Sequence, residues 1–216
     1  MAQILPPSAN LAVRLALAGA VLAGAGVLWL LAEIGGSSWV TRAGAAPAQP
    51  VPFSHKLHVG GLGLDCRHCH TLVETSAGAG MPSTKTCMHC HSQVFSDAAL
   101  LEPVRVALEQ DRSIEWVRVT DLPDFVYFDH SIHVRKGFAC VTCHGRVDQM
   151  PVIEQPIALT MRWCLDCHRH PERYVRPPEQ VFSMSWEPEG DAAAAGARLA
   201  RQLGLRRPTD CSFCHR

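Results

Sequence analysis

The chain has 216 residues with 20 basic and 20 acidic side chains, so its formal charge excludes any strong electrostatic case for binding nucleic acid. Aromatic residues make up only 6% of the sequence, and Gly and Pro occupy 16 and 15 positions, so a core made of protein alone would be small. The length suits one ordinary domain, or a small domain with an anchor.

The first predicted element is an apolar helix from Leu11 to Ile34, within which the stretch from Leu15 to Ala32 carries no charge. At about 1.5 Å rise per residue the run spans about 36 Å, enough to cross a hydrocarbon core of about 30 Å. We therefore expect residues 1–35 to form a single transmembrane anchor. The alternative is a cleaved signal peptide, with a cleavage site among the small residues of Ala43 to Ala48.

A linker is predicted next, at residues 36–52, because Ala43 to Pro52 is rich in Ala and Pro and such segments are stiff. The rest of the chain divides into a first unit with its connector at residues 53–127, a second unit at residues 128–175 and a C-terminal extension at residues 176–216.

All ten cysteines lie in Cys-x-x-Cys-His strings, and none is left over. This spacing places two sulfurs near the two vinyl groups on one haem edge, and the next residue then presents an imidazole to the iron. The five strings, which we number as motifs 1 to 5, are Cys66-x-x-Cys69-His70, Cys87-x-x-Cys90-His91, Cys140-x-x-Cys143-His144, Cys164-x-x-Cys167-His168 and Cys211-x-x-Cys214-His215.

Two other interpretations of the cysteines are weaker. A disulfide scaffold would suit an even number of cysteines but would leave the five following histidines unexplained. Structural zinc sites combine two Cys-x-x-Cys units, and five units cannot be paired evenly. The sequence therefore predicts five covalently attached haem c groups. Their propionates would make the loaded protein acidic, and Arg135, Arg162, Arg169 and Arg173 are candidate propionate partners.

A second pattern occurs twice, as Phe53-x-His55-x-x-His58 before motif 1 and as Phe128-x-His130-x-x-His133 before motif 3. Five six-coordinate irons need five ligands besides the motif histidines, and these two pairs supply four. Three residues apart, the two histidines of a pair share one face of a helical turn and can serve two adjacent haems. We interpret the remaining histidines, His68, His89 and His170, as surface groups.

Secondary structure elsewhere is expected to be modest. We predict helices from Pro103 to Gln110 and from Ala192 to Leu203, the latter started by Asp191 and stopped by Gly204. Short extended pieces are predicted at Trp116 to Val119 and Phe125 to Phe128. The predicted fold class is mainly α with extensive irregular loops, a multihaem domain built around stacked haems plus one N-terminal transmembrane helix.

The duplicated units resemble the class III multihaem cytochromes, on the strength of Leu122-Pro-Asp-Phe-Val-Tyr-Phe128 and of Met161-Arg-Trp-Cys-Leu-x-Cys-His-Arg169. With the anchor and motif 5, the chain is similar to the pentahaem subunit of bacterial alternative complex III. That resemblance implies electron transfer within a quinol-oxidising complex. The implied partners are polytopic quinol-binding membrane subunits, a large iron–sulfur subunit, and a monohaem cytochrome c or other soluble acceptor.

One position departs from those relatives, which often carry His where this chain has Thr120. A methionine sulfur is the expected substitute at one iron, and it raises the reduction potential relative to a second imidazole. Met184, between Phe182 and Trp186, is the first candidate. Met161, Met150 and Met81 follow it.

The leading functional hypothesis is an electron-transfer subunit that catalyses no reaction on its own. Haem attachment of this type takes place outside the cytoplasm, so we expect a single-pass protein of the cytoplasmic membrane with its haem domain on the periplasmic side. The alternatives are a multihaem reductase with one open iron, and a stand-alone quinol dehydrogenase. Binding of carbon monoxide and direct reduction by quinol would separate these possibilities.

Overall fold

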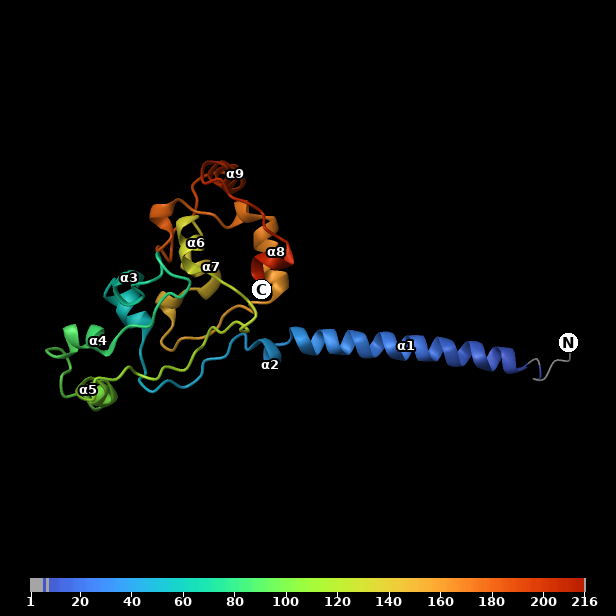
Figure 1. Cartoon of the computed structure of the whole chain (residues 1–216), viewed down its shortest axis with the longest axis horizontal. Helices are drawn as coiled ribbons and strands as arrows, with labels where there is room; N and C mark the ends of the chain where they lie inside the picture. The colour runs from blue at the N-terminus through green and yellow to red at the C-terminus, as the bar shows by residue number, and fades with distance from the viewer. Residues whose placement is uncertain (1–5, 7, 216) are drawn as a thin grey trace. The chain divides into compact units, whose positions relative to one another are not determined.

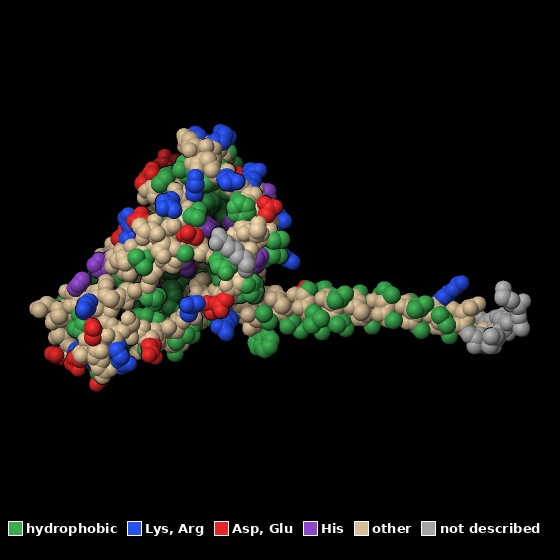
Figure 2. Space-filling model, in the orientation of Figure 1, with side chains coloured by type: hydrophobic (Ala, Val, Ile, Leu, Met, Phe, Trp, Pro, Cys, Tyr) green, Lys and Arg blue, Asp and Glu red, His purple; other side chains and the backbone are tan. Residues whose placement is uncertain are grey.

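The computed structural model describes residue 6 and residues 8–215 and divides into two compact units, Met1–Arg42 and Ala43–Arg216. The first unit contains α1 (Ser8–Gly36, 29 residues) and the short α2 (Ser38–Thr41). No residue of α1 is buried, and it is the one described helix long and apolar enough to cross a membrane. Its hydrophobic side chains cover its whole length (Figure 2). The predicted apolar helix is therefore present, while the first residues of the predicted 1–35 segment lie outside the described residues.

The Ala43–Arg216 unit consists of short helices separated by long loops (Figure 1). Within its described residues no strand is formed, and the mainly helical fold is confirmed. The helices are η1 (Lys56–Gly61), α3 (Cys66–Cys69), α4 (Thr84–His91), η2 (Ala99–Leu101), α5 (Glu102–Glu109), α6 (His130–Arg135), α7 (Cys140–His144), η3 (Val147–Gln149), α8 (Met161–Arg169), η4 (Pro171–Arg173), η5 (Pro178–Gln180), α9 (Ala192–Gln202) and α10 (Cys211–Cys214).

Both helices predicted outside the motifs are present. In α5, Pro103 occupies the first turn, where its missing N–H costs nothing. In α9, the side chain of Asp191 accepts hydrogen bonds from the backbone N–H groups of Ala193 and Ala194. Gly204 follows with a φ of 57°, a left-handed conformation that glycine adopts readily and that ends the helix.

The two predicted extended pieces do not become strands. Residues 116–119 are irregular, and the segment 125–128 makes one isolated antiparallel bridge, between Val126 and His215. A strand needs a neighbouring strand to satisfy its backbone groups, and these loops instead pair with a side chain or with a single residue. Gln49, for example, exchanges hydrogen bonds of 3.0 Å with both backbone groups of Val117.

The protein core of this unit is small. Among the described residues, the buried hydrophobic side chains are valines, alanines and one methionine, and the largest fully buried ones are Val104 and Val181. One cluster joins Val73, Val134 and Val181, with Ala79 and Phe182 packed against it. Valines bury too little apolar area to stabilise a unit of this size, so the side chains alone do not explain the fold.

Candidate functional site

Each of the five cysteine motifs lies on a helix, as the spacing predicts. Motifs 1 and 5 form the single turns α3 and α10, and motif 3 forms α7. Motifs 2 and 4 occupy the second halves of the longer helices α4 and α8. A helical turn brings residues three apart to the same face, so both thiols of each motif can reach one edge of a flat ligand.

The two Phe-x-His-x-x-His segments have the same geometry. The Phe53 ring stacks on His58, with centroids 4.3 Å apart and planes at 26°, and meets the edge of His55 at 4.9 Å. Phe128 stacks on His133 at 4.5 Å and 26° and meets the edge of His130 at 4.8 Å. Each phenylalanine thus fixes the orientation of two imidazoles, a role that the repeated Phe in the sequence did not by itself reveal.

Three of these imidazoles each face a motif histidine. His58 lies 6.2 Å from His91 between ring centroids, His130 lies 6.3 Å from His144, and His133 lies 6.2 Å from His168. Two imidazoles bound to one metal from opposite sides have centroids about 6.2 Å apart, given metal–nitrogen bonds of about 2.0 Å and a ring radius of about 1.1 Å. The three pairs therefore have the separation that a shared iron requires.

His55 and His70 interact electrostatically. Burial, then the charges of His70 and His58, lower the pKa of His55 to about 4. Burial likewise lowers the pKa of His144 to about 4, with contributions from His130, His70 and His55. These imidazoles are consequently neutral at physiological pH, which is the form that binds a metal.

Most of the predicted iron-binding histidines use Nδ1 to hold a backbone carbonyl, at distances from 2.7 to 3.2 Å. A carbonyl oxygen can only accept, so Nδ1 carries the proton and the Nε2 lone pair is free for a metal. The bonds join His58 to Ser54, His70 to Gly80, His91 to Val94, His130 to Ala77, His133 to Asp129, His168 to Pro208 and His215 to Phe125.

The spare histidines differ. In the described part of the chain, none of His68, His89 and His170 holds a carbonyl in this way, and His170 instead lies 3.7 Å from the Glu172 carboxylate. This difference separates the predicted ligands from the predicted surface groups. Sequence could not have shown it fully, because three of the seven acceptors lie 40 or more residues from their histidine.

Two buried polar atoms in this region have no partner among the described residues, His55 Nδ1 and Trp116 Nε1. Trp116 meets Phe53 edge-on, with centroids 6.5 Å apart, so both atoms lie beside the first histidine pair. Buried donors are almost always satisfied in folded proteins. A group with acceptor oxygens, such as a haem propionate, would satisfy them, and the residues present therefore fit a haem at this place.

Motif 5 is held by the segment 125–127. His215 donates to the carbonyl of Phe125, and the backbone N–H of Tyr127 donates to the carbonyl of Cys214 at 2.8 Å. Among the ring contacts of the described residues, none places a second imidazole opposite His215. The histidine count in the sequence leaves one iron without a second imidazole, and its place at motif 5 stays a prediction.

The candidate methionines lie in different places. The segment of Met184 adjoins motifs 1 and 3, because Phe182 stacks under Arg67 and the Val181 carbonyl accepts from the Cys140 N–H. Met161 begins α8, is 66% exposed, and lies one turn before motif 4, whose His168 donates through Nδ1 to the Pro208 carbonyl just before motif 5. Met150 is buried and its carbonyl accepts from the Lys56 N–H, whereas Met81 is exposed.

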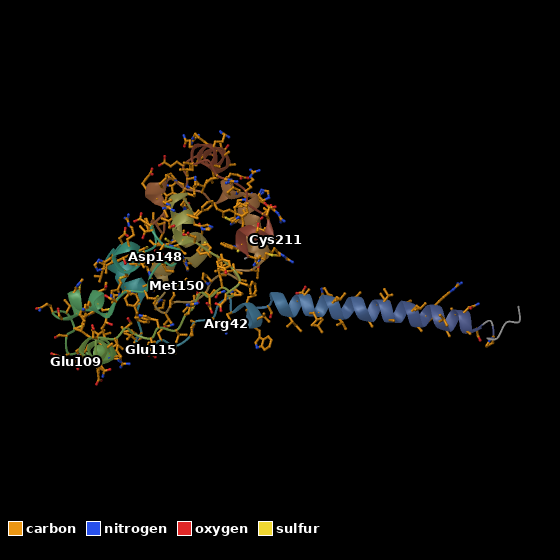
Figure 3. All side chains as sticks on the ribbon, viewed as in Figure 1. Arg42, Glu109, Glu115, Asp148, Met150 and Cys211 are labelled. Atoms are coloured by element: carbon orange, nitrogen blue, oxygen red, sulfur yellow. The ribbon has the colours of Figure 1, made fainter. Side chains whose placement is uncertain are left out.

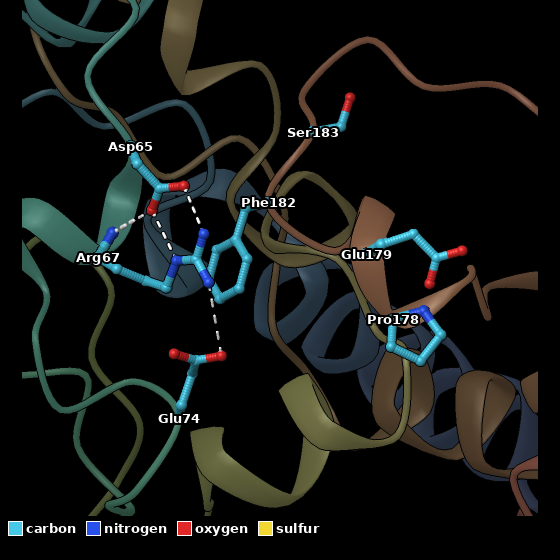
Figure 4. A pocket seen from close by; sticks show the side chains of 7 residues that line it. All are labelled: Asp65, Arg67, Glu74, Pro178, Glu179, Phe182 and Ser183. Atoms are coloured by element: carbon cyan, nitrogen blue, oxygen red, sulfur yellow. Dashed lines mark hydrogen bonds and ion pairs between the residues drawn. The ribbon is translucent and has the colours of Figure 1, made fainter.

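An open hollow of about 490 Å³ lies beside motif 1 (Figure 4). Arg67 spans it, with Asp65 at 2.8 Å, Glu74 at 3.8 Å and its guanidinium 4.3 Å from the Phe182 centroid. These neighbours raise the pKa of Arg67, chiefly through the hydrogen bonds that its guanidinium donates to Asp65, so the side chain stays charged. The contacts fix segment 178–183 against motif 1 and do not enclose a substrate.

The Asp129 side chain caps α6, accepting from the backbone N–H groups of Ser131 and Ile132 and from the Ser131 hydroxyl. We expect Asp129→Ala to lower the free energy of unfolding by about 1 kcal/mol and to change the visible spectrum of the loaded protein, because this helix carries His130 and His133. Asp191→Ala is the matched control, since Asp191 caps α9 in the same way but α9 carries no histidine. Equal spectra in the two variants would contradict the prediction; thermal unfolding and absorption measure both effects.

Comparison with known proteins gives a consistent result. The family described as cytochrome c7 and related cytochrome c matches residues 51–107 and 126–216, which is most of the chain. The multiheme cytochrome c subunit of a menaquinone reductase from Nitratidesulfovibrio vulgaris (strain Hildenborough) is 39% identical over 97 residues. The match covers 44% of this chain and 45% of the relative, so the chain spans about half of that protein's length.

Proposed function

Because the chain belongs to the family of cytochrome c7 and related c-type cytochromes, we propose that it is a membrane-anchored pentahaem cytochrome that carries electrons within a quinol-linked complex. The observation that carries the proposal is the set of facing imidazoles, three pairs of which lie 6.2 to 6.3 Å apart. A haem c bound at each motif supplies an iron that accepts and releases one electron.

The residues divide into three roles in this proposal. The motif cysteines hold the haems covalently, and His70, His91, His144, His168 and His215 bind the irons from one side. On the other side, His55 serves motif 1, His58 motif 2, His130 motif 3 and His133 motif 4. Where they occur, the Nδ1 bonds fix the ring in the orientation its iron requires and make the imidazole a stronger donor.

The paired ligands also argue against substrate chemistry at four of the five irons. An iron that binds two imidazoles has no open position for a substrate, so motifs 1 to 4 suit electron transfer and not reduction of a bound molecule. Motif 5 is the one place where an open iron could occur. Carbon monoxide that binds to no reduced haem of the native protein would support the carrier, whereas binding at motif 5 would favour the multihaem reductase.

For the complex itself, we favour the pentahaem subunit of alternative complex III. Its partners would be polytopic quinol-binding subunits, a large iron–sulfur subunit and a monohaem cytochrome c or other soluble acceptor. The helix α1 would anchor it in the cytoplasmic membrane with the haem domain on the periplasmic side. The similarity to a menaquinone reductase subunit supports a second candidate, in which electrons move toward menaquinone.

The direction of electron flow can be tested on the complex extracted in mild detergent. Quinol should reduce the haems and the electrons should reach an added monohaem cytochrome c, while mass spectrometry should show five haem masses on this chain and name its partners. Haems that are oxidised by menaquinone, but not reduced by quinol, would favour the second candidate. Haem reduction by quinol in the isolated chain would favour the stand-alone dehydrogenase.

We expect a methionine to supply the sixth ligand of the iron at motif 5. That haem should then have the highest reduction potential of the five, because a thioether stabilises ferrous iron. The placement of α8 beside motif 5 favours Met161 over Met184, the residue favoured by the sequence alone. Met161→Leu should lower the highest midpoint potential and remove the His/Met spectral features, and Met184→Leu should leave both unchanged. A redox titration followed by electron paramagnetic resonance measures both effects. If Met184→Leu lowers the highest potential and Met161→Leu does not, Met184 is the ligand.

A further inference from the structure

We propose that the five motifs form one unbranched row in the spatial order 2, 1, 3, 4, 5, so that electrons enter and leave the chain at motif 2 and motif 5. The inference rests on the proposed function, because it concerns the route between haems bound at these motifs. The order in space differs from the order along the sequence, and four sets of contacts establish its four steps.

Motifs 1 and 2 are neighbours because one short segment serves both. His58 faces His91 of motif 2 with ring centroids 6.2 Å apart, and His55, one helical turn earlier, interacts electrostatically with His70 of motif 1.

Motif 1 is joined to motif 3 by contacts between the two repeated units. The Ala77 carbonyl, in the loop after motif 1, accepts both the backbone N–H of His130 at 3.1 Å and its Nδ1 at 2.8 Å. The Ser131 N–H donates to the Ser76 carbonyl at 3.2 Å. The start of α6, which carries the proposed motif 3 ligand His130, therefore packs directly on the loop after motif 1.

A close backbone approach supports the same step. A Cβ at Gly60, in η1, would collide with the carbonyl oxygen of Asp148, in η3 directly after motif 3. The Lys56 N–H donates to the Met150 carbonyl at 2.9 Å, and Figure 3 marks both Asp148 and Met150 in the middle of the unit. The segment that serves motifs 1 and 2 therefore packs on the chain leaving motif 3.

Motifs 3 and 4 repeat the arrangement of motifs 1 and 2. His130 faces His144 and His133, one turn later in α6, faces His168. The shared helix α6 therefore holds two adjacent irons.

Motif 5 adjoins motif 4. The Pro208 carbonyl, three residues before Cys211, accepts from Nδ1 of His168 at 2.8 Å.

Motif 2 has only motif 1 as a neighbour in this row, because its helix α4 otherwise packs on α5, which carries no motif. Thr84, at the start of α4, donates to the Arg112 carbonyl at 2.8 Å just beyond α5. The α4–α5 region therefore ends the row on one side, and motif 5 ends it on the other. Tunnelling rates fall steeply with distance, so an external donor or acceptor must dock at one of these ends.

Electron cryo-microscopy of the native complex tests the order directly, because the irons are its densest features. We expect the four shortest iron–iron distances within this chain to join motifs 2 and 1, 1 and 3, 3 and 4, and 4 and 5. A different pair among those four, such as 2 with 3 or 1 with 5, would overturn the order. Fewer than five irons would instead refute the proposed function.

A matched pair of variants tests the ends by redox titration. His58→Met and His133→Met each raise the potential of one iron, at motif 2 and motif 4. Reducing that iron first lowers the potentials of adjacent irons most. We expect His58→Met to lower the midpoint potential of one other haem strongly, and His133→Met to lower the midpoint potentials of two. Two lowered potentials in His58→Met, or only one in His133→Met, would contradict a row that ends at motif 2.

Discussion

Replacing Cys140 and Cys143 together by Ala is expected to abolish accumulation of the folded protein. Motif 3 lies in the middle of the proposed row, and the protein offers little core of its own there, with Val134 and Val181 among its few buried side chains. Without the haem, α6 and α7 would lose the group on which His130 and His144 converge. Haem-stained gels and quantitative blotting of membranes measure the effect.

The matched control is the same change in motif 5, Cys211→Ala with Cys214→Ala. The helix α10 is a single turn close to the end of the chain, with Cys211 exposed, so its haem should matter far less for folding. This variant should accumulate with one haem mass fewer. A stable motif 3 variant with normal helix content by circular dichroism would show that the haems are not the main interior of the protein.

Local features of this chain could be predicted well from the sequence, because neighbouring residues decide them. The cap of α9 follows from Asp191 and Gly204, and the helical turn at each motif follows from the attachment spacing. The repeated histidine pairs could also be recognised, because the residues of each pair lie close together in the sequence. The strand predicted at Trp116 to Val119 failed because a strand depends on a partner elsewhere, and here the partner is the single side chain of Gln49.

The pairing of ligands could not be predicted, because it depends on contacts between distant segments. In the sequence, His55 and His58 are equivalent candidates for motif 1 or motif 2. The structure separates them through Phe53, which stacks on His58, and through the 6.2 Å spacing of His58 and His91. The contacts of His168 with Pro208 and of His130 with Ala77 span 40 and 53 residues, which no local pattern encodes.

Replacing His130 with Gly is expected to open the iron at motif 3, because the structure brings no other imidazole to His144 at that distance in its described part. Reduced variant protein should bind about one carbon monoxide per chain beyond the native protein, since a five-coordinate ferrous haem accepts this ligand. Absorption of the carbonyl complex measures the change. His170→Gly is the control, because His170 holds no backbone carbonyl and should bind none.

Imidazole supplied in solution separates ligation from folding in this variant. Free imidazole fits the space of the lost side chain and should restore the low-spin spectrum and exclude carbon monoxide, although it cannot restore the bond from the His130 backbone to Ala77 if that segment has moved. Recovery of the spectrum by imidazole therefore requires that His130 acted through its ring at the iron. If the variant keeps a low-spin spectrum without imidazole and binds no carbon monoxide, His130 is a surface residue and the ligand of motif 3 must be sought elsewhere.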